Sequence, residues 1–143
     1  MPGPIETHGP VIWVTLGYLL VYYAFLLNGL RVKLRVSREC RERGERFDRY
    51  RGDYPALRAS DRIQLNTLEH MPPFLVFLWL HAFVVGPASA TALGWVYVLL
   101  RATYPLFLGV RLGRNIPRRL LINTFSGYVV LAVLGAWTAV RLV

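Results

Sequence analysis

Long uncharged stretches alternate with strongly charged segments along this chain, and the uncharged stretches predict its helices. Val11 to Leu30 carries no charged side chain, and a helix of that length would reach about 30 Å, the thickness of a bilayer's hydrocarbon core. His70 to Leu100 and Leu120 to Val140 are also uncharged when histidine is counted as neutral. The stretch from His70 is too long for one span, and Gly86-Pro87-Ala88-Ser89 supplies a turn inside it.

The pattern predicts an all-α fold, a four-helix transmembrane bundle in which residues 1–143 form one membrane domain. The expected spans are 11–30, 62–85, 88–112 and 120–141, and Ser60-Asp61 offers N-cap chemistry for the second. Only helices or closed barrels satisfy the backbone in lipid, which favours a bundle. Residues 1–10 contain three prolines and are expected to be irregular. A cleaved signal peptide is not expected, because the first uncharged stretch is too long and no Lys or Arg precedes it.

The composition supports a membrane protein. Hydrophobic residues make up 55% of the chain and charged residues 17%, whereas a soluble domain carries roughly 25% charged residues. The net charge is nevertheless +9, which by itself suits either a nucleic-acid binder or a membrane protein. The one cysteine, Cys40, excludes an intramolecular disulfide, and we expect it to have no specific role.

The location of the charges decides between these two classes. Residues 31–62 contain 11 of the 17 basic and 6 of the 8 acidic side chains, and residues 111–119 add four arginines. No Lys or Arg occurs in residues 1–10 or 86–91. The positive-inside rule then places loops 31–62 and 111–119 in the cytoplasm and both termini on the opposite side. Acidic residues alternate with the arginines of 31–62, which favours a solvated helix face over a nucleic-acid surface.

Polar side chains open the second predicted span at positions that share one helix face. They follow the spacing i, i+4, i+7 and i+8 and are Arg62, Asn66, Glu69 and His70. Gln64 lies roughly 200° around the helix from Arg62 and is expected to face a different neighbour. A charge inside a membrane costs roughly 2.5–3.5 kcal/mol, so these residues are candidates for function. Alternatively, they form a hydrogen-bonded cluster that locks the bundle, or a helix end at the membrane interface.

The third predicted span carries a second polar face, formed by Tyr97, Arg101, Tyr104, Leu108 and Arg111. Arg118 would extend this face if the helix continued through Pro117. A buried arginine needs a carboxylate, and Glu69 is the acid available for an ion pair with Arg101. Tyr97, taken alone, is typical of an anchor at the membrane interface.

The histidines and the absence of several motifs narrow the chemistry. His8, His70 and His81 are too dispersed for a metal site, and His81 is expected to form a hydrogen bond between helices. The chain has no G-x-G-x-x-G, P-loop or H-E-x-x-H pattern, and no metal is expected. Arginines, an acid, an asparagine and a tyrosine at the ends of two helices suit a small zwitterionic or polyanionic ligand.

The second span also resembles a motif of a known family. Its residues read Arg62-Ile-Gln64-Leu-Asn66-Thr-Leu-Glu69-His70-Met-Pro72, followed by Phe74-Leu75 and Leu78-Trp79. They resemble the R-x-Q-x-N-x-x-E pattern of the MAPEG family, the membrane-associated proteins in eicosanoid and glutathione metabolism. Chain length, four spans, the basic first loop and the spacing of Arg101 and Tyr104 are similar too. The resemblance implies a homotrimer of four-helix protomers, like the microsomal glutathione transferases, with glutathione bound between neighbouring subunits.

The resemblance further implies which residues bind glutathione. From one subunit they would be Arg62, Asn66, Glu69, His70, Arg101 and Tyr104. His70 stands where several relatives have tyrosine and could replace its hydrogen bond. Gln64 and Arg31 would reach the glutathione of the adjacent subunit.

The resemblance also implies an arginine that stabilises the glutathione thiolate, either Arg114 or Arg118. A free thiol has a pKa of ~8.5, and a neighbouring cation lowers it and raises the thiolate fraction. Two positions depart from the family. Leu108 stands where relatives often have a ligand-binding tyrosine, and Val32 stands where the leukotriene-forming relatives have a second arginine.

The expected function is that of an integral-membrane glutathione transferase. Glutathione would be the co-substrate, and its thiolate would attack a lipophilic electrophile, or reduce a lipid hydroperoxide, that enters from the membrane lipids. A second hypothesis is a non-catalytic membrane scaffold of the same fold that binds lipid or glutathione. A third is an unrelated small membrane protein whose polar faces only hold helices together. Nucleic acid is not expected as a partner.

Overall fold

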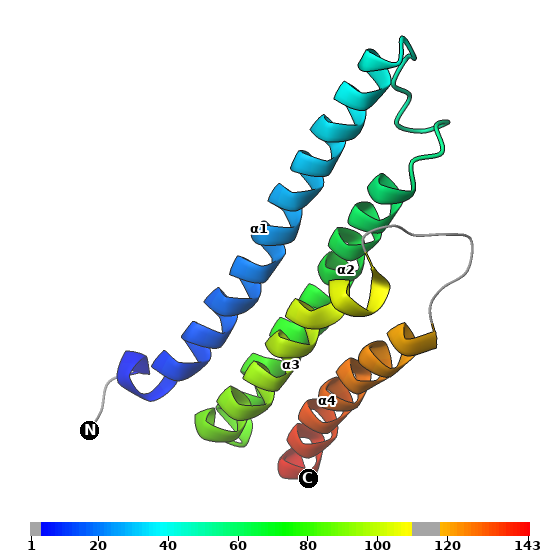
Figure 1. Ribbon diagram of the computed structural model, residues 1–143. Coiled ribbons are helices and arrows are strands. Elements are labelled where there is room, and N and C mark those ends of the chain that lie inside the picture. The colour runs from blue at the N-terminus through cyan, green and yellow to red at the C-terminus, as the bar shows by residue number, and fades with distance from the viewer. Residues whose placement is uncertain (1–3, 110–117) are drawn as a thin grey trace.

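The computed structural model describes residues 4–109 and 118–143, which form four helices and no strand. The helices are α1 (Pro4–Glu42), α2 (Pro55–Val84), α3 (Pro87–Leu108) and α4 (Arg118–Leu142) (Figure 1). α1 and α4 each pack against α2 and α3 but do not touch one another within these residues. The all-α prediction is therefore confirmed, and the order of the helices is the expected one.

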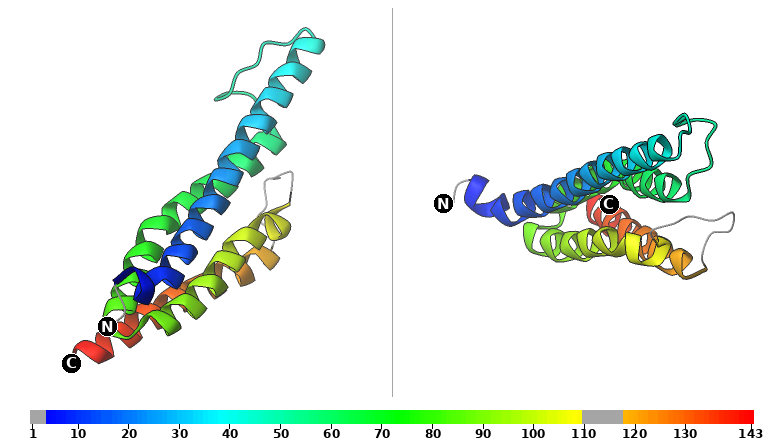
Figure 2. Two further views of the ribbon diagram at one scale, coloured as in Figure 1. Left: turned by 90° about the vertical axis from the view of Figure 1, so that its left-hand side faces the viewer. Right: turned by 45° about the horizontal axis from the view of Figure 1, so that its top comes forward.

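The two ends of the bundle differ in what they carry. The start of α1, the end of α4 and the short turn between α2 and α3 lie at one end, which we call the terminal end (Figures 1 and 2). Residues 43–54, which connect α1 to α2, lie at the other, the loop end, where α1 and α2 project beyond α3 and α4. α1 and α3 both end toward the loop end, and α2 and α4 both begin there. The assignment of that end to the cytoplasm stays a prediction.

α1 is much longer than the expected span of 11–30. It begins at Pro4, so the prediction that residues 1–10 are irregular is wrong for the described residues among them, and it continues to Glu42. The charged segment after residue 30 stays helical because side chains one turn apart, such as Arg35 and Glu39, form i,i+4 ion pairs. The helix ends in a Schellman motif, because Gly44 adopts φ +71° and the Glu45 N–H bonds the Cys40 carbonyl. The loop predicted at 31–62 is therefore only residues 43–54.

α2 begins earlier than expected, so the N-cap prediction for Ser60-Asp61 is wrong. Tyr54 occupies the N-cap without a side-chain cap, and Pro55 opens the first turn, where its fixed φ suits a helix and its missing N–H does no harm. Ser60 is buried inside the helix. The helix also continues through Pro72-Pro73 to Val84, so the polar face of residues 62–70 lies on one uninterrupted element.

The predicted turn between the second and third helices is confirmed at Gly86, whose φ of +148° a residue with a side chain would rarely adopt. α3 ends at Leu108, before the expected residue 112, because Gly109 at φ +87° closes the helix. Its polar face therefore does not extend to Arg118, which instead begins α4. Arg111 lies outside the described residues.

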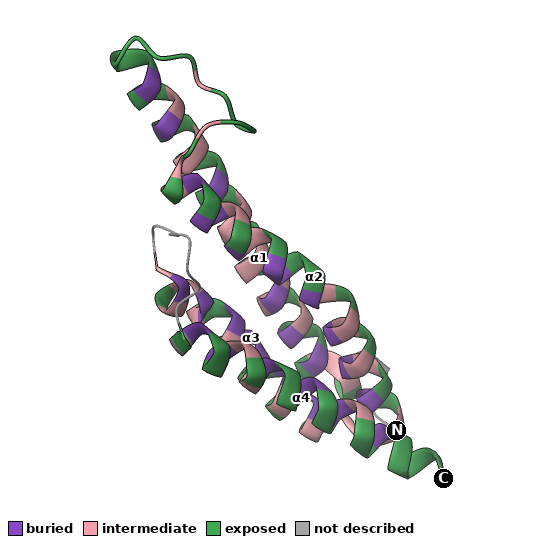
Figure 3. Ribbon diagram, turned by 90° about the vertical axis from the view of Figure 1, so that its right-hand side faces the viewer, coloured by how far each residue is buried: buried purple, intermediate pink, exposed green. Residues whose placement is uncertain are grey.

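Three of the helices are long and apolar enough to cross a membrane, with spans at Glu6–Glu42, Pro87–Leu108 and Leu120–Leu142. α2, the fourth predicted span, is not among them, because its polar opening, two histidines and two prolines lower its hydropathy. Large apolar side chains such as Trp13, Leu99 and Phe125 are exposed. Exposed positions recur along all four helices (Figure 3). Such a surface suits lipid or a further protein chain rather than water.

The core has two parts. Toward the terminal end, residues such as Val14, Tyr18, Phe74 and Leu78 pack together. Gly94 of α3 allows close approach there, since a Cβ at this position would lie 2.7 Å from Val14 Cγ1 and 2.9 Å from Leu78 Cδ1. A smaller cluster toward the loop end contains Ala59, Ile63, Tyr104, Leu108 and Leu120. The predicted polar faces of α2 and α3 meet between these two clusters.

Candidate functional site

Arg101 lies at the centre of the candidate site and is completely buried. Its Nη1 donates a hydrogen bond of 2.6 Å to Oδ1 of Asn66 in α2. Its Cζ lies 5.3 Å from the centre of the Tyr97 ring and 5.7 Å from that of Tyr104, so the cation contacts two aromatic rings. Nε and Nη2 have no hydrogen-bond partner among the described residues. A buried cation with two free donors is therefore the main feature of the site.

Gly127 of α4 makes room for this guanidinium. A Cβ at Gly127 would lie 2.5 Å from Arg101 Nη2 and 3.6 Å from a ring carbon of Tyr97. Real Cβ atoms do not approach so closely, so any larger residue here would displace Arg101. Sequence reasoning did not identify Gly127, because a glycine in an apolar span gives no signal of the side chain it faces.

The predicted polar face of α2 divides in two. Asn66 and His70 are buried, whereas Arg62 and Glu69 are exposed. The Arg62 side chain hydrogen-bonds the Tyr104 hydroxyl, and the charge of Glu69 also acts on Tyr104. The face thus links the buried Arg101 site to two exposed charges of opposite sign, which is an arrangement suited to a zwitterionic ligand.

The expected ion pair between Arg101 and Glu69 is wrong. The Arg101 guanidinium contacts Asn66 through Nη1, and neither its Nε nor its Nη2 has a partner among the described residues, so Glu69 is not paired with it there. Arg101 uses the amide of Asn66, because Asn66 is buried where the two helices meet while Glu69 lies at the exposed edge of α2.

Tyr97 does not lie at the membrane interface, so the prediction of an anchor is wrong. It is fully buried, stacks on Phe74 with ring centres 4.3 Å apart, and its hydroxyl lies 2.8 Å from His70 Nδ1. Tyr18 of α1 joins the cluster by donating a hydrogen bond of 2.6 Å to the carbonyl of Thr67. Sequence reasoning missed Tyr18, because a tyrosine inside an apolar run looks the same whether it faces lipid or the core.

Gln64 faces away from this cluster, as its position on the helix predicted. Its Oε1 would lie 3.4 Å from a Cβ at Gly29, so it approaches α1. With Leu30 and Lys33 it lines a shallow cavity of about 350 Å³ between α1 and α2. Arg31 is exposed on α1. The pair predicted to serve the adjacent subunit therefore lies in the α1–α2 half of the chain.

The two candidates for thiolate stabilisation differ in what the structure says of them. Arg114 lies outside the described residues. Arg118 is exposed at the start of α4, at the loop end of the bundle. It contributes to the positive charge of this end and is not enclosed like Arg101.

Asn123, a polar residue of the predicted span 120–141, was also not identified from the sequence. It is buried at the contact of α4 with α3 and donates through Nδ2 to the carbonyl of Leu100 at 3.0 Å. Its Oδ1 has no partner in the part of the chain that the structure describes. It lines an apolar groove of about 390 Å³ together with Leu100, Phe107 and Ile122. An isolated asparagine in an uncharged stretch is the signal that could have identified it.

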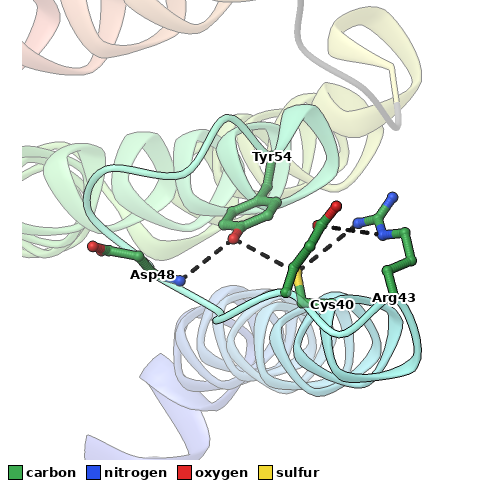
Figure 4. A network of polar contacts seen from close by, with 5 residues as sticks. Cys40, Arg43, Asp48 and Tyr54 are labelled. Atoms are coloured by element: carbon green, nitrogen blue, oxygen red, sulfur yellow. Dashed lines mark hydrogen bonds and ion pairs between the residues drawn. The ribbon is translucent and has the colours of Figure 1, made fainter.

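Cys40 has a structural role that the sequence did not predict. It is buried, and its thiol donates to the Tyr54 hydroxyl at 3.6 Å, which also accepts the backbone N–H of Asp48 at 3.4 Å (Figure 4). The contact with Cys40 raises the pKa of the Tyr54 hydroxyl. The backbone N–H groups of Arg51 and Tyr50 lower the pKa of the Asp48 carboxyl. These contacts fold residues 43–54 back onto the end of α1.

His81 confirms the prediction of a hydrogen bond between helices. Its Nδ1 lies 3.2 Å from Thr138 Oγ1 and 3.3 Å from the Leu134 carbonyl in α4, and its Nε2 lies 3.0 Å from Ser89 Oγ in α3. The carbonyl can only accept, so Nδ1 carries the proton. This cluster at the terminal end joins three helices.

The comparison with known families decides the relationship. The model of the MAPEG family matches residues 10–140, which reach from the first turns of α1 to the last turns of α4. The chain belongs to the MAPEG family. The resemblance inferred from the residues between Arg62 and Pro72 is thereby confirmed. No curated protein matches the chain.

Membership of the MAPEG family makes this an integral-membrane protein, in agreement with its three apolar helices. The MAPEG family includes glutathione transferases and related proteins. The matched region contains both polar faces, the buried Arg101 and the exposed Arg62 and Glu69.

Proposed function

We propose that this MAPEG protein is a glutathione transferase that conjugates glutathione to lipophilic electrophiles, or uses it to reduce lipid hydroperoxides. The observation that carries the proposal is the buried Arg101, held by Asn66 and left with two free donors next to the exposed Arg62 and Glu69. Such a cluster is expensive to maintain in a membrane protein unless a ligand uses it.

Glutathione has two carboxylates and one ammonium group, and the exposed charges suit these groups. Arg62 is exposed, so its guanidinium can donate to a carboxylate in addition to the Tyr104 hydroxyl. Glu69 is exposed and can accept the ammonium group. Asn66 and Arg101 lie behind this surface, where Arg101 would hold Tyr104 in place and offer its free Nε and Nη2 to the bound peptide. His70, bound to Tyr97, would support the same wall.

Glutathione would be activated by an arginine of the second basic segment, Arg114 or Arg118. A cation that lowered the pKa of the thiol by two units would supply roughly 2.7 kcal/mol and make thiolate the main form at neutral pH. The sulfur then forms a bond to the electrophilic carbon, and the leaving group departs with the electron pair of its broken bond. The arginine also stabilises the negative charge that develops during this step. No nucleophile from the protein is needed.

The electrophile would come from the membrane through the face formed by α3 and α4. Beside the groove at Asn123 lies an open apolar depression of about 580 Å³, lined by residues such as Val96, Leu121, Phe125 and Val129. Both are on the outside of the two helices whose loop ends carry Tyr104 and Arg118. An apolar substrate in lipid would reach the site without crossing water.

A homotrimer would complete this site. α1 and α4 do not touch within the described residues, and both carry exposed apolar side chains such as Leu20 and Phe125. Gln64 and Arg31, which lie in the α1–α2 half, would then contact the glutathione bound by the Arg62 of a neighbouring subunit. We therefore expect the active form to be a homotrimer.

The test is conjugation of glutathione to chlorodinitrobenzene by the purified, lipid-supplemented protein, with chloride as leaving group. We expect Arg114→Ala or Arg118→Ala to reduce kcat by at least about 100-fold, which corresponds to the loss of one preorganised charge contact. Arg141→Ala, at the other end of α4, serves as the matched control and should keep its activity. Protein that neither binds nor turns over glutathione would refute the proposal.

A non-catalytic glutathione- or lipid-binding scaffold is the second candidate. It is favoured by the exposure of Arg118 and by the apolar Leu108 on the polar face of α3. Glutathione would then bind without the ultraviolet absorbance of a thiolate, and no conjugation would be measured.

A further inference from the structure

Two hollows lie next to each other where the connection between α1 and α2 folds back along the bundle. The first is the shallow cavity of about 350 Å³ between α1 and α2, whose wall contains leucines of both helices, such as Leu30 and Leu57. The second is an open hollow of about 560 Å³ between α1 and residues 46–50, which we call the loop hollow. Lys33 and Arg49 line both, so an apolar surface and a basic surface meet at these two side chains.

This meeting point lies at the expected boundary of the membrane. Leu30 is the last residue of the first uncharged stretch, and Lys33 follows nearly one helical turn later. The start of α2 lies lower along the bundle than the end of α1, so the connection descends from the tip of α1 toward that boundary (Figure 1). The leucines of the first cavity are therefore at the level of lipid chains, and the cations of the loop hollow are at the level of lipid headgroups.

Three cations line the loop hollow, namely Lys33 of α1 and Arg46 and Arg49 of the connection. Lys33 forms no hydrogen bond or ion pair within the described part of the chain. Arg46 is exposed. The two side chains can thus donate to an anion without breaking a strong contact of the protein.

The acids of the two hollows already have partners. The Oδ1 atom of Asp48 accepts the backbone N–H groups of Tyr50 and Arg51 at 2.9 and 3.1 Å. Asp61 Oδ1 accepts a hydrogen bond of 3.4 Å from Arg49 Nη2, and this ion pair ties the connection to α2. The acids therefore hold the loop in shape, and the charge that remains for a ligand is positive.

The connection is fixed on the helices by further contacts and is not a free basic loop. The Tyr54 hydroxyl accepts the Asp48 N–H and contacts the thiol of the buried Cys40 (Figure 4). The Gly52 N–H donates to the Asp48 carbonyl at 3.0 Å, and the Phe47 and Tyr54 rings lie 5.3 Å apart. Cations on such a frame lose less conformational entropy when a ligand binds than cations on a flexible chain do.

We propose that the two hollows bind one anionic phospholipid. Its phosphate would accept hydrogen bonds from Lys33, Arg46 and Arg49, and one acyl chain would cover Leu30 and the other leucines of the first cavity. Tyr50, which is 92% exposed, lines the loop hollow and is an aromatic residue of the kind found at membrane interfaces. A free phosphate would leave the leucines uncovered, so the phospholipid is the ligand that fits both surfaces.

The test is a lipid titration of the purified full chain in detergent, followed by native mass spectrometry. Dioleoyl phosphatidylglycerol should bind at least about tenfold more tightly than dioleoyl phosphatidylcholine, whose choline neutralises the charge of the phosphate. Equal affinities overturn the proposal. Glycerol 3-phosphate is the third arm, and if it displaces phosphatidylglycerol at equal concentration, the apolar cavity contributes nothing and the phospholipid is the wrong ligand.

Two variants and a matched control distinguish a site from the general positive charge of this end. Lys33→Gln and Arg46→Gln should each weaken the binding of phosphatidylglycerol about fivefold, the effect of one cation near an anionic lipid. Arg38→Gln removes the same charge from an exposed position of α1 outside both hollows and should stay within about twofold of the wild type. If the control loses as much as the two variants, only net charge matters and the proposal is wrong.

Glutathione binding separates this inference from the proposed function. Arg62 and Glu69 line neither hollow, so Lys33→Gln and Arg46→Gln should bind glutathione like the wild type. A protein that binds no glutathione but prefers phosphatidylglycerol refutes the proposed function alone. If the two variants lose glutathione and phosphatidylglycerol binds no better than phosphatidylcholine, the two cations serve glutathione and the lipid site is refuted.

Discussion

The two halves of the bundle treat their buried polar groups in opposite ways. At the terminal end, both ring nitrogens of His81 have partners, in α4 through Thr138 and in α3 through Ser89. Toward the loop end lie all the buried side-chain atoms without a partner among the described residues. These atoms are Ser60 Oγ, Arg101 Nε and Nη2, and Asn123 Oδ1.

The difference shows what distinguishes a structural polar cluster from a binding site in a membrane. A polar group in the spans is tolerated when the protein satisfies it completely, as around His81. A cluster that stays unsatisfied, borders exposed charges and carries a full positive charge needs a partner from outside the chain. Arg101 meets all three conditions, and His81 meets none.

Removal of the buried charge should have the largest effect. Arg101→Gln removes the cation and its contacts with Tyr97 and Tyr104, so we expect the affinity for glutathione to fall about 100-fold. Arg101→Lys keeps the charge without the planar fork and should lie between this variant and the wild type. Equilibrium dialysis with the folded, lipid-supplemented protein measures both. If Arg101→Gln binds glutathione with unchanged affinity, the unsatisfied polar cluster toward the loop end is not a binding site.

Loss of the satisfied cluster should affect stability alone. His81→Ala removes hydrogen bonds that join α2 to α3 and α4, and we expect the free energy of unfolding to fall by about 1–2 kcal/mol. The affinity for glutathione should stay within about twofold of the wild type. Denaturation in mixed micelles, with the same dialysis assay, gives the two numbers. If His81→Ala has normal stability but binds glutathione poorly, the His81 cluster serves binding and not stability, contrary to this account.

Two glycines of α4 provide a smaller and more specific contrast. In Gly127→Ala the new Cβ would lie 2.5 Å from Arg101 Nη2 and displace the guanidinium, so we expect glutathione affinity to fall about tenfold. In Gly135→Ala the Cβ would meet only the Phe77 ring at 3.3 Å, which a small shift of the ring relieves. The second variant should bind glutathione like the wild type, and equal losses in both would show that the effect is not specific to Arg101.

The smallest effect is expected in the exposed loop 43–54, whose polar contacts belong to neither cluster. Backbone N–H groups lower the pKa of Asp48 below that of an unfolded aspartate. Its contribution to stability is therefore present above the unfolded pKa of about 3.9 and is lost as the pH falls through the lower folded value. The protection factors of the amide hydrogens in this loop should fall over that acidic range in the wild type. In Asp48→Asn they should already be lower at neutral pH. A wild-type loop that exchanges at a constant protection across the range contradicts this.

The order of the helices and the polar face of α2 could be predicted from the sequence. The side chains that surround this face could be predicted only in part. Spacing alone identified Arg62 and Asn66 as neighbours on one face, but that face is wide enough to meet the core on one side and the exterior on the other. The partner of Arg101 could not be predicted for this reason, since the amide of Asn66 is buried and the carboxylate of Glu69 is not. His81 was predicted correctly, because an isolated histidine in an apolar span must find partners.

Helix ends were the least predictable features. The charged segment after residue 30 was expected to be a loop, but charged residues with i,i+4 pairs such as Arg35 and Glu39 continue a helix into water. Ser60 has the chemistry of an N-cap, yet Pro55 opens the helix more than a turn earlier. Tyr18 was not predicted as a core residue, because its role depends on Thr67, which is 49 positions away in the sequence.

The most direct test is a glutathione titration that records ultraviolet absorbance of the bound thiolate at neutral pH in three proteins. The wild type should bind glutathione saturably with a thiolate signal, His81→Ala should keep both, and Arg101→Gln should lose them. If the folded wild type binds no glutathione, or Arg101→Gln binds it with an unchanged signal, the unsatisfied half of the bundle is not a glutathione site.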